Sequence, residues 1–299
     1  MITYERCPLC GSASIQEVLV ATDYTVSSEK FEIYQCANCS FRFTQHIPTA
    51  DEIGRYYQSE NYISHTETNK GIVNWLYLRV RKFTLSSKRE FIEDETKLKK
   101  GSLLDIGAGA GAFPHHMKEH GWNVEGVEPD NSAIERAAKE YGLQLKPSAH
   151  LFDYNPASFD AVTMWHVLEH VHQLHEYIDQ LKKICKPGGR IFIAVPNYTS
   201  FDAEYYGASW AAYDVPRHLY HFSPAAMHEL MRRHQCTIEK IQPMWFDSFY
   251  VSLLSEKYKT GSSNLFKGFW YGLRSNMKAM YNKRKSSSVI YVISPYLPA

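Results

Sequence analysis

Short apolar runs alternate with amphipathic segments through most of the 299-residue chain. Apolar runs flanked by turn residues indicate buried strands, whereas apolar positions three or four residues apart indicate helices. The predicted strands span residues 102–106, 124–128, 143–146, 159–165, 191–195, 237–241 and 289–293. Helices are expected between them, including one that begins with Ser223 as cap and Pro224 in its first turn. This alternation predicts an α/β fold with a doubly wound, mainly parallel, seven-stranded sheet.

The N-terminal part of the chain has a different pattern, in which two strand-like runs, 17–21 and 31–35, lie between two Cys-x-x-Cys pairs. The four cysteines are Cys7, Cys10, Cys36 and Cys39. Four thiolates suit tetrahedral zinc, and a complete set of cysteine ligands leaves no coordination position for a substrate. We therefore predict a zinc-ribbon-like unit over residues 1–46 with structural zinc, and a redox or disulfide pair is the alternative.

The rest of the chain divides into a connecting region and a large domain. Residues 47–100 are interpreted as a Tyr-rich linker followed by a helical lead-in with apolar residues at Ile72, Leu76, Val80 and Phe83. The large domain spans 101–299, and segments 197–222 and 246–288 are expected to be substrate or lid insertions.

Composition excludes several classes of protein. The 33 Lys plus Arg residues nearly balance the 32 Asp plus Glu residues, and this balance argues against general polyanion binding. No stretch approaches the roughly 18 apolar residues of a membrane-spanning helix, and the N-terminus lacks a signal-peptide pattern. We therefore expect a cytoplasmic location and no specific nucleic-acid partner.

A glycine-rich turn follows the first strand of the large domain. Gly107, Gly109 and Gly111 would let a ligand approach the backbone, and Glu128, which ends the next strand, could accept both ribose hydroxyls. The same glycines also fit a dinucleotide fingerprint. Asp105 favours another adenosine ligand, because a carboxylate there would repel a diphosphate and attract a sulfonium with a cationic amino group.

Together these motifs resemble the class I S-adenosylmethionine-dependent methyltransferases. The resemblance rests on the Asp105 to Gly111 loop, the sequence from Glu128 to Asp130, His166 to His170 after the fourth strand, and Lys186 to Gly189 before the fifth. It implies a Rossmann-like methyltransferase domain with S-adenosyl-L-methionine as cofactor. It also implies that Gly107 and Gly109 lie near the methionine part of the cofactor, Glu128 on the ribose and His166 near the methyl group. The other cofactor-binding candidates are Asp105, Ala108, Gly111, Pro129 and Asp153.

The sequence from His166 to His170 also spells the His-x-x-Glu-His signature of one metallopeptidase class. That function requires both histidines on one helical face. Because the segment starts at the end of a predicted strand, we do not expect it to be helical throughout.

The segment 197–222 follows the fifth strand at the carboxyl edge of the sheet, where α/β proteins bind ligands. It is rich in aromatic residues, and we expect it to form the acceptor site. His218 and His221 are candidate general bases, with a hydrogen-bonded histidine of the core or lid as the alternative, and Arg217 could hold a carboxylate or phosphate.

Residues 257–285 contain 8 Lys plus Arg and no acidic residue, with apolar residues at helical spacing. Such a basic amphipathic helix could contact an anionic membrane surface, or its apolar stripe could cover a substrate pocket or form a homodimer interface. The net charge of +1 therefore combines +8 from this segment with −7 from the rest of the chain.

The zinc unit, the Tyr-rich linker and this core together resemble the C-methyltransferases of nucleotide-linked deoxysugars. The leading hypothesis is a methyltransferase acting on a small molecule such as a nucleotide-linked sugar or another natural-product precursor. The alternatives are an rRNA methyltransferase with a zinc module and a non-catalytic zinc-ribbon binding module.

Overall fold

The computed structural model describes residues 1–57, 72–262 and 264–295, except for the side chains of residues 72–81. The larger of its two sheets has seven strands in the order β10-β11-β8-β7-β4-β5-β6. Their bounds are β4 (Ser102–Ile106), β5 (Asn123–Glu128), β6 (Lys146–Pro147), β7 (Phe159–Trp165), β8 (Cys185–Pro196), β10 (Thr237–Pro243) and β11 (Ser288–Ser294). Strands β4 to β8 pair in parallel, and β11 runs antiparallel between β8 and β10. The predicted α/β fold with a mainly parallel seven-stranded sheet is confirmed.

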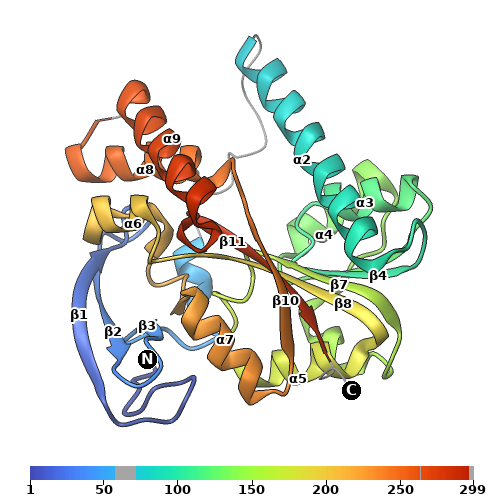
Figure 1. Cartoon of the computed structure of the whole chain (residues 1–299), viewed down its shortest axis with the longest axis horizontal. Helices are drawn as coiled ribbons and strands as arrows, with labels where there is room; N and C mark the ends of the chain where they lie inside the picture. Colours follow the sequence, from blue (N-terminus) through green and yellow to red (C-terminus); the bar gives the residue numbers. More distant parts are fainter. Residues whose placement is uncertain (58–71, 263, 296–299) are drawn as a thin grey trace.

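Helices cover both faces of this sheet (Figure 1). Neighbouring strand residues point to opposite faces, so Leu103 packs with α2 and α3 while Leu104 belongs to the core beneath α5 and α7. These helices are α2 (Ile72–Thr96), α3 (Ala112–Glu119), α4 (Asn131–Tyr141), α5 (Leu174–Ile184) and α7 (Pro224–Arg233). Helix α6 (Phe201–Tyr206) packs instead with residues of the smaller sheet. Ser223 caps α7 by accepting the Ala226 N–H, as its Ser-Pro start predicts.

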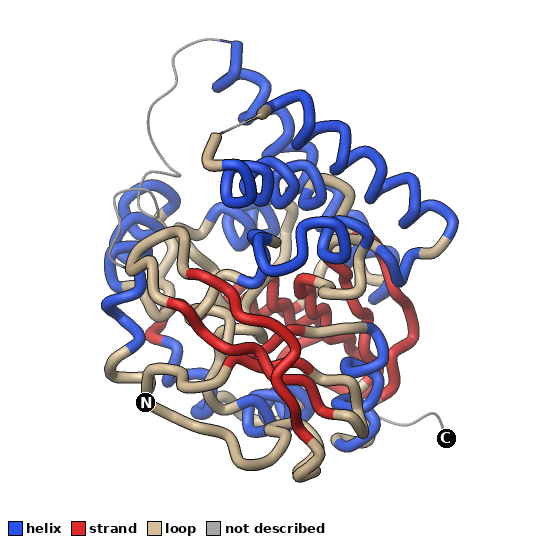
Figure 2. Tube along the Cα trace, turned by 90° about the vertical axis from the view of Figure 1, so that its left-hand side faces the viewer, coloured by secondary structure: helices blue, strands red, loops and turns tan. Residues whose placement is uncertain are grey.

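A second, antiparallel sheet has the strand order β1-β2-β3-β9 and faces the viewer in Figure 2. Its first three strands are β1 (Ile15–Thr22), β2 (Lys30–Cys36) and β3 (Arg42–Thr44). Its fourth strand, β9 (Tyr220–His221), comes from far along the chain, and Arg42 and Phe43 pair with it. The N-terminal unit therefore shares a sheet with the segment that follows strand β8.

The aromatic residues of segment 197–222 mostly pack inward against this second sheet. Trp210 and Tyr213 lie in one buried cluster with Ala21, Phe31 and Ile33 of the small sheet. Short 3-10 helices complete the segment at Gly207–Ser209 and Ala211–Tyr213, and others lie at Ile53–Tyr57, Ser148–Asp153 and Lys283–Lys285. Much of the aromatic content expected at an acceptor site therefore forms a hydrophobic core.

Three local predictions differ from the structure. Strand β6 covers Lys146 and Pro147, not 143–146, because Leu143 and Leu145 are buried against Ala137 of α4. Residues Lys186 to Gly189 are expected before the fifth strand but lie within β8, where they form an irregularity between the pairs Phe159↔Cys185 and Ala161↔Arg190. The helical lead-in is present as α2, where Phe83 is exposed, and the other apolar positions named for it lie outside the described side chains.

Two helices, α8 (Asp247–Thr260) and α9 (Leu265–Tyr281), lie between β10 and β11. They pack side by side at the edge of the molecule (Figure 1). The predicted helical insertion before the last strand is confirmed, although it consists of two helices. The large apolar residues of α9 are exposed, so its stripe does not cover a pocket within the described chain.

Candidate active site

The glycine loop connects β4 to α3 at the carboxyl edge of the large sheet. Gly107, Gly109 and Gly111 all have positive φ angles, of 70°, 53° and 84°. The backbone N–H groups of Gly107 and Ala108 both donate to the Val127 carbonyl of β5, which fixes the start of the turn. A left-handed conformation at three positions explains why the loop contains glycine.

The three glycines have different surroundings. A Cβ atom on Gly107 would lie 2.3 Å from Val167 Cγ2, and one on Gly111 would lie 2.9 Å from the Ala137 Cβ. No atom lies within 4 Å of the Cβ position of Gly109. Gly107 and Gly111 are thus required for packing, whereas the backbone at Gly109 is open to a ligand.

Glu128 lies directly beside that open position. One carboxylate oxygen accepts the Gly109 N–H at 2.7 Å, and the other accepts the Asp130 N–H at 3.1 Å. The side chain is buried, and burial raises its pKa despite these two hydrogen bonds. Pro129, the next residue, is exposed. An open glycine backbone next to a carboxylate with two oxygens fits the ribose of an adenosine cofactor.

Asp105 is buried at the end of β4 and accepts a hydrogen bond from the Thr163 hydroxyl at 2.5 Å. Burial raises its pKa to about 7, although Thr163 and the nearby Lys88 oppose the shift. The negative charge predicted for Asp105 is therefore only partly present near neutral pH. A cationic group brought to this edge would favour its ionised form.

His166 follows β7 at the same edge and has a positive φ of 57°. Its Nδ1 lies 3.4 Å from Glu169 Oε1, and its Nε2 lies 2.9 Å from Asp247 Oδ2. The His166 side chain is 35% exposed, whereas Glu169 is 1% exposed. The imidazole is therefore held between a buried carboxylate and a carboxylate that belongs to the first residue of α8.

These two carboxylates control the protonation of His166. Burial lowers the pKa of the imidazole, but Asp247 and then Glu169 outweigh burial and raise the pKa to about 10. Burial likewise raises the pKa of Asp247, and His166 more than reverses that change. In this arrangement His166 is a cation at neutral pH.

A lysine completes this group. Lys88 of α2 lies with its Nζ 4.1 Å from the centre of the Trp165 ring. Burial lowers its pKa, while the charges of Asp105 and Asp247 act in the opposite direction. Lys88 therefore links the end of β4 electrostatically to the His166 ion pair.

Sequence reasoning missed Lys88, Thr163 and Asp247 as members of this site. A signal for Asp247 existed, because β10 runs parallel to β8 and an acid soon after its end must lie at the same edge as His166. Lys88 carried no comparable signal, since it lies within a long helix whose position on the sheet depends on tertiary packing.

The structure does not bring Asp153 to this edge. Asp153 is exposed and lies 3.2 Å from His150, beside a hollow that also contains Ser102 and Asn123. Ser102 and Asn123 begin β4 and β5, so this hollow lies at the amino edge of the sheet. The length of β4, roughly 15 Å, separates it from the glycine loop. The expectation that Asp153 contacts the cofactor is therefore wrong, because the 3-10 helix after β6 turns its end back along the sheet.

The two histidines predicted as candidate bases, His218 and His221, are enclosed by protein. His221 belongs to β9, contacts Thr44 Oγ1 at 3.0 Å and has its pKa lowered well below the usual value by burial. His218 is 8% exposed, and its Nδ1 lies 2.8 Å from the Ala212 carbonyl. Both match the alternative of hydrogen-bonded core histidines, so among the three candidates His166 lies at the cofactor edge.

Arg217 does not face a ligand either. Its guanidinium is fully buried and donates to Asp23, to Asp214 and to the Tyr56 carbonyl. Asp23 lies at the end of β1, so this ion pair joins the N-terminal unit to segment 197–222. The expectation that Arg217 holds a carboxylate or phosphate is wrong because its donors already have protein partners.

Glu169, His170 and His218 form a second group whose ligand atoms lie within 4.8 Å of one another. The residues from His166 to His170 form a bend and turn and not a helix, so the two histidines of the metallopeptidase signature do not share a helical face. Since the Glu169 carboxylate is the counter-charge of His166, we assign no metal to this group.

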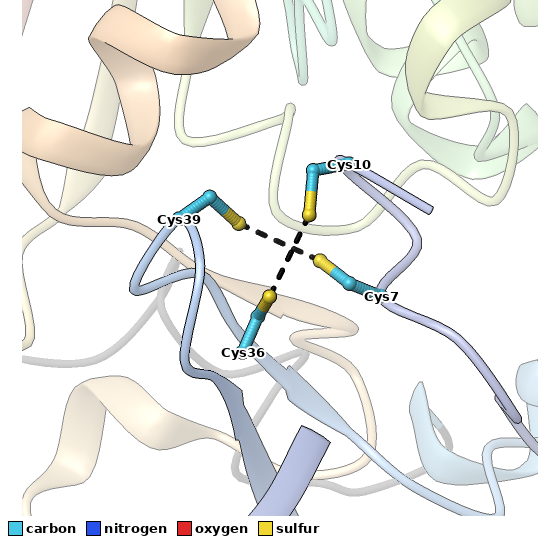
Figure 3. Close-up of side chains that lie close together, drawn as sticks. All are labelled: Cys7, Cys10, Cys36 and Cys39. Atoms are coloured by element: carbon cyan, nitrogen blue, oxygen red, sulfur yellow. Dashed lines mark hydrogen bonds between the residues drawn. The ribbon is translucent and has the colours of Figure 1, made fainter. Parts of the chain in front are cut away.

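The four N-terminal cysteines do come together (Figure 3). Cys7 Sγ lies 3.6 Å from Cys39 Sγ, and Cys10 Sγ lies 3.5 Å from Cys36 Sγ. Four sulfurs at zinc-ligand distance from a tetrahedral ion would lie about 3.8 Å apart. This donor set and spacing therefore fit structural zinc, which would be held by the four thiolates and would crosslink the two cysteine turns.

The turns that carry these cysteines have the same local geometry. Gly11 N–H donates to the Cys7 carbonyl, and Ser40 N–H donates to the Cys36 carbonyl. Gly11 and Ser40 each lie four residues after the first cysteine of a pair and have φ angles of 74° and 58°. Each pair thus forms a tight turn that directs both sulfurs to one point.

Among the described residues, no helix combines the length and apolar character needed to cross a membrane.

An open α/β sheet with a glycine turn after β4 and a buried carboxylate, Glu128, at the end of β5 is the arrangement in which proteins bind an adenosine cofactor at the carboxyl edge of the sheet. The antiparallel β11 beside β8 and the motifs around His166 and Asp105 identify the class I S-adenosylmethionine-dependent methyltransferases. A family model described as a methyltransferase domain matches residues 77–241. The chain belongs to this methyltransferase family.

Two similar curated proteins are ubiquinone biosynthesis O-methyltransferases. That of Maricaulis maris is 33% identical over 129 residues, which cover 40% of this chain and 51% of that protein. That of Idiomarina loihiensis is 36% identical over 115 residues, which cover 36% of this chain and 47% of that protein. The chain thus spans about half the length of these curated relatives.

A solved structure supports the fold. A protein from Galdieria sulphuraria, provisionally named a sarcosine dimethylglycine methyltransferase, has a TM-score of 0.50 and 12% sequence identity. The match covers 73% of this chain and 86% of that one. At this identity the likeness concerns the fold alone.

Proposed function

We propose that this protein transfers a methyl group from S-adenosyl-L-methionine to a hydroxyl oxygen of a small molecule. The observation that carries the proposal is the position of His166 at the carboxyl edge, between Glu169 and Asp247 and beside the glycine loop. The names of the two ubiquinone biosynthesis O-methyltransferases support oxygen as the acceptor atom.

When bound, S-adenosyl-L-methionine supplies an electrophilic methyl group on a sulfonium sulfur. Gly109 would allow the close approach of this cofactor, Glu128 would hold its ribose, and Asp105 would face its positive charges. Methylation of a hydroxyl also requires removal of the hydroxyl proton, and a histidine is the usual group for that task.

Glu169 orients His166 through Nδ1, which leaves Nε2 to face the acceptor. In the structure Nε2 contacts Asp247, so an acceptor hydroxyl would take the place of this carboxylate. His166 must also lose its proton before it can accept another. Separation from Asp247 and the approach of a positive charge both lower the imidazole pKa, and both accompany binding at this edge.

The direct test is methyl transfer from deuterated-methyl S-adenosyl-L-methionine to a set of acceptors, followed by mass spectrometry. The set includes catechols and other phenols, a nucleotide-linked deoxysugar and rRNA. We expect an O-methylated phenol and, in His166→Ala, a fall in kcat of about 10²- to 10⁴-fold. S-adenosylhomocysteine binding should remain intact in that variant. Products methylated only on carbon or nitrogen, or full turnover by His166→Ala, would contradict the proposal.

A second candidate is C-methylation of a nucleotide-linked sugar, which the resemblance of the whole arrangement to the sugar C-methyltransferases favours. The supporting observation is the cysteine unit, whose sheet includes β9 of the large domain. The deoxysugar arm of the same assay separates this candidate from the first. An rRNA acceptor has less support, since residues 1–46 contain five acidic and three basic residues.

We also propose that the four cysteines bind zinc and that the protein is cytoplasmic. The zinc proposal rests on the four sulfurs that converge on one point. Metal analysis of the purified chain should yield one zinc per protein, and a folded, metal-free chain would contradict it.

A further inference from the structure

Helix α9 has an unusual distribution of large and small residues. Its buried positions are occupied by small residues, namely Gly268, Gly272, Ser275 and Ala279. Its large apolar residues are exposed: Leu265, Phe266, Phe269, Trp270, Met277, Met280 and Tyr281. A helix that only covers a core has the opposite arrangement, with its large apolar residues buried.

Close packing of α9 on α8 produces this arrangement. A Cβ atom on Gly268 would lie 2.8 Å from the Leu253 Cα, and one on Gly272 would lie 2.8 Å from the Phe249 Cα. At both glycines α9 therefore approaches the α8 backbone without a side chain of its own in between. Tyr271 packs inward on Tyr205, but most of the other bulky residues of α9 lie away from this contact and are exposed.

The exposed face is broad and strongly apolar. Phe266 is 79% exposed, Met280 74% and Tyr281 90%. Trp245, just before α8, is exposed as well, and its backbone carbonyl contacts Asn276 of α9. Exposed aromatic residues gathered in this way mark an interaction surface.

Positive charges flank this face. Lys267, Arg274 and Lys278 are exposed and recur at positions i, i+7 and i+11, which align on one side of the helix. Lys283 and Arg284 follow the end of α9 and are exposed as well. Lys267 lies 3.8 Å from Glu256, and Lys285 lies 2.7 Å from Glu204. Since residues 257–285 contain eight cations and no acidic residue, the surface still combines aromatic side chains with an excess of positive charge.

We propose that the α9 face docks the protein on an anionic lipid bilayer. Large apolar side chains would enter the boundary between headgroups and acyl chains, and the flanking cations would contact anionic headgroups. A contact between two copies fits less well, because lysine is depleted in protein interfaces and identical positive faces repel each other.

The docking face is connected to the active site. Asn276 of α9 donates to the Trp245 carbonyl, two residues before Asp247. Asp247 in turn contacts His166. An acceptor held in the bilayer would therefore lie near the helix pair that carries Asp247, the carboxylate in contact with His166. Docking itself does not depend on the proposed reaction.

The experiment is co-sedimentation of the full chain with vesicles of phosphatidylcholine alone or mixed with phosphatidylglycerol. We expect binding to the mixed vesicles that weakens with added salt. Lys278→Glu combined with Lys283→Glu should weaken partitioning by at least about 25-fold, since each charge removed accounts for about fivefold. Phe266→Ser combined with Trp270→Ser should weaken it as well. The matched control is Lys118→Glu with Lys139→Glu, which changes exposed lysines of α3 and α4 and should leave binding unchanged.

Cofactor binding and thermal melting verify that every variant is folded, which is expected because the changed side chains are exposed. Equal sedimentation of the wild type and the α9 variants would overturn the proposal. The proposal would also be overturned if the wild type does not bind vesicles and is a dimer in light scattering, while Phe266→Ser/Trp270→Ser is a monomer. In that case the face joins two copies of the chain.

Discussion

The glycine loop allows a sharp test, because a single added methyl group should act differently at Gly109 and at Gly111. Both positions have positive φ, so alanine at either one costs about 1–2 kcal/mol of backbone strain. At Gly109 the methyl group meets no protein atom within 4 Å. At Gly111 it would lie 2.9 Å from the Ala137 Cβ and 3.1 Å from Leu143 Cδ1.

These contacts set the expected magnitudes. Overpacking at Gly111 adds about 1–3 kcal/mol, so Gly111→Ala should lower the free energy of unfolding by about 2–5 kcal/mol in total. Gly109→Ala should lower it only by the strain of about 1–2 kcal/mol. The methyl group at Gly109 would instead press on the bound cofactor and weaken its affinity by about 10- to 100-fold.

The assay pairs urea unfolding with calorimetric titration of S-adenosylhomocysteine. The expected pattern is a nearly stable Gly109→Ala protein with weak binding, and a destabilised Gly111→Ala protein whose folded fraction binds normally. If Gly109→Ala binds as tightly as the wild type, the cofactor does not approach this backbone. If the two variants lose equal stability, the packing argument for Gly111 fails.

Three further changes test other parts of the structure. Asp247→Asn removes the nearer negative charge from His166 and should lower the pKa of that imidazole by about one to two units from its value of about 10, as measured by histidine NMR. Because this pKa is raised, the ion pair stabilises the wild-type fold fully below pH 6.5 and progressively less as pH rises towards 10. Asp247→Asn should therefore lose less stability than the wild type between pH 6.5 and pH 10. An unchanged histidine titration in the variant would contradict the contact. Cys36→Ser, or treatment with a strong chelator, should remove zinc and lower Tm, whereas an equal Tm would argue against structural zinc. Arg217→Met leaves two aspartates without their buried partner and should cost about 3–5 kcal/mol in urea unfolding, and a loss below about 1 kcal/mol would refute the importance of this pair.

Most of the large sheet could be predicted from sequence because its signals are local. The strand bounds at 102–106 and 159–165 agree with β4 and β7, since each is a short, mostly apolar run between turn residues. Strand β9 could not be predicted in this way. It contains only Tyr220 and His221, and it is a strand because β3 provides its partner.

The site shows the same division between local and distant information. Gly109 and Glu128 belong to motifs that can be read along the chain, and the structure joins them by a hydrogen bond. The contact between His166 and Asp247 joins residues 81 positions apart and depends on how α8 leaves β10. The exposure of most large apolar residues of α9 depends on the close approach of Gly268 and Gly272 to α8, a contact between two helices that the sequence pattern of α9 alone does not show.

The shared strand β9 limits how this protein could have been assembled or could be divided. Removal of residues 1–46 would leave β9 without its partner strand and Arg217 without Asp23, and both losses fall within the segment between β8 and α7. The N-terminal unit is therefore not a detachable module that could be exchanged between enzymes. In evolution and in engineering alike, the cysteine unit and the methyltransferase domain would have to change together, because strand β9 and Arg217 have partners in both.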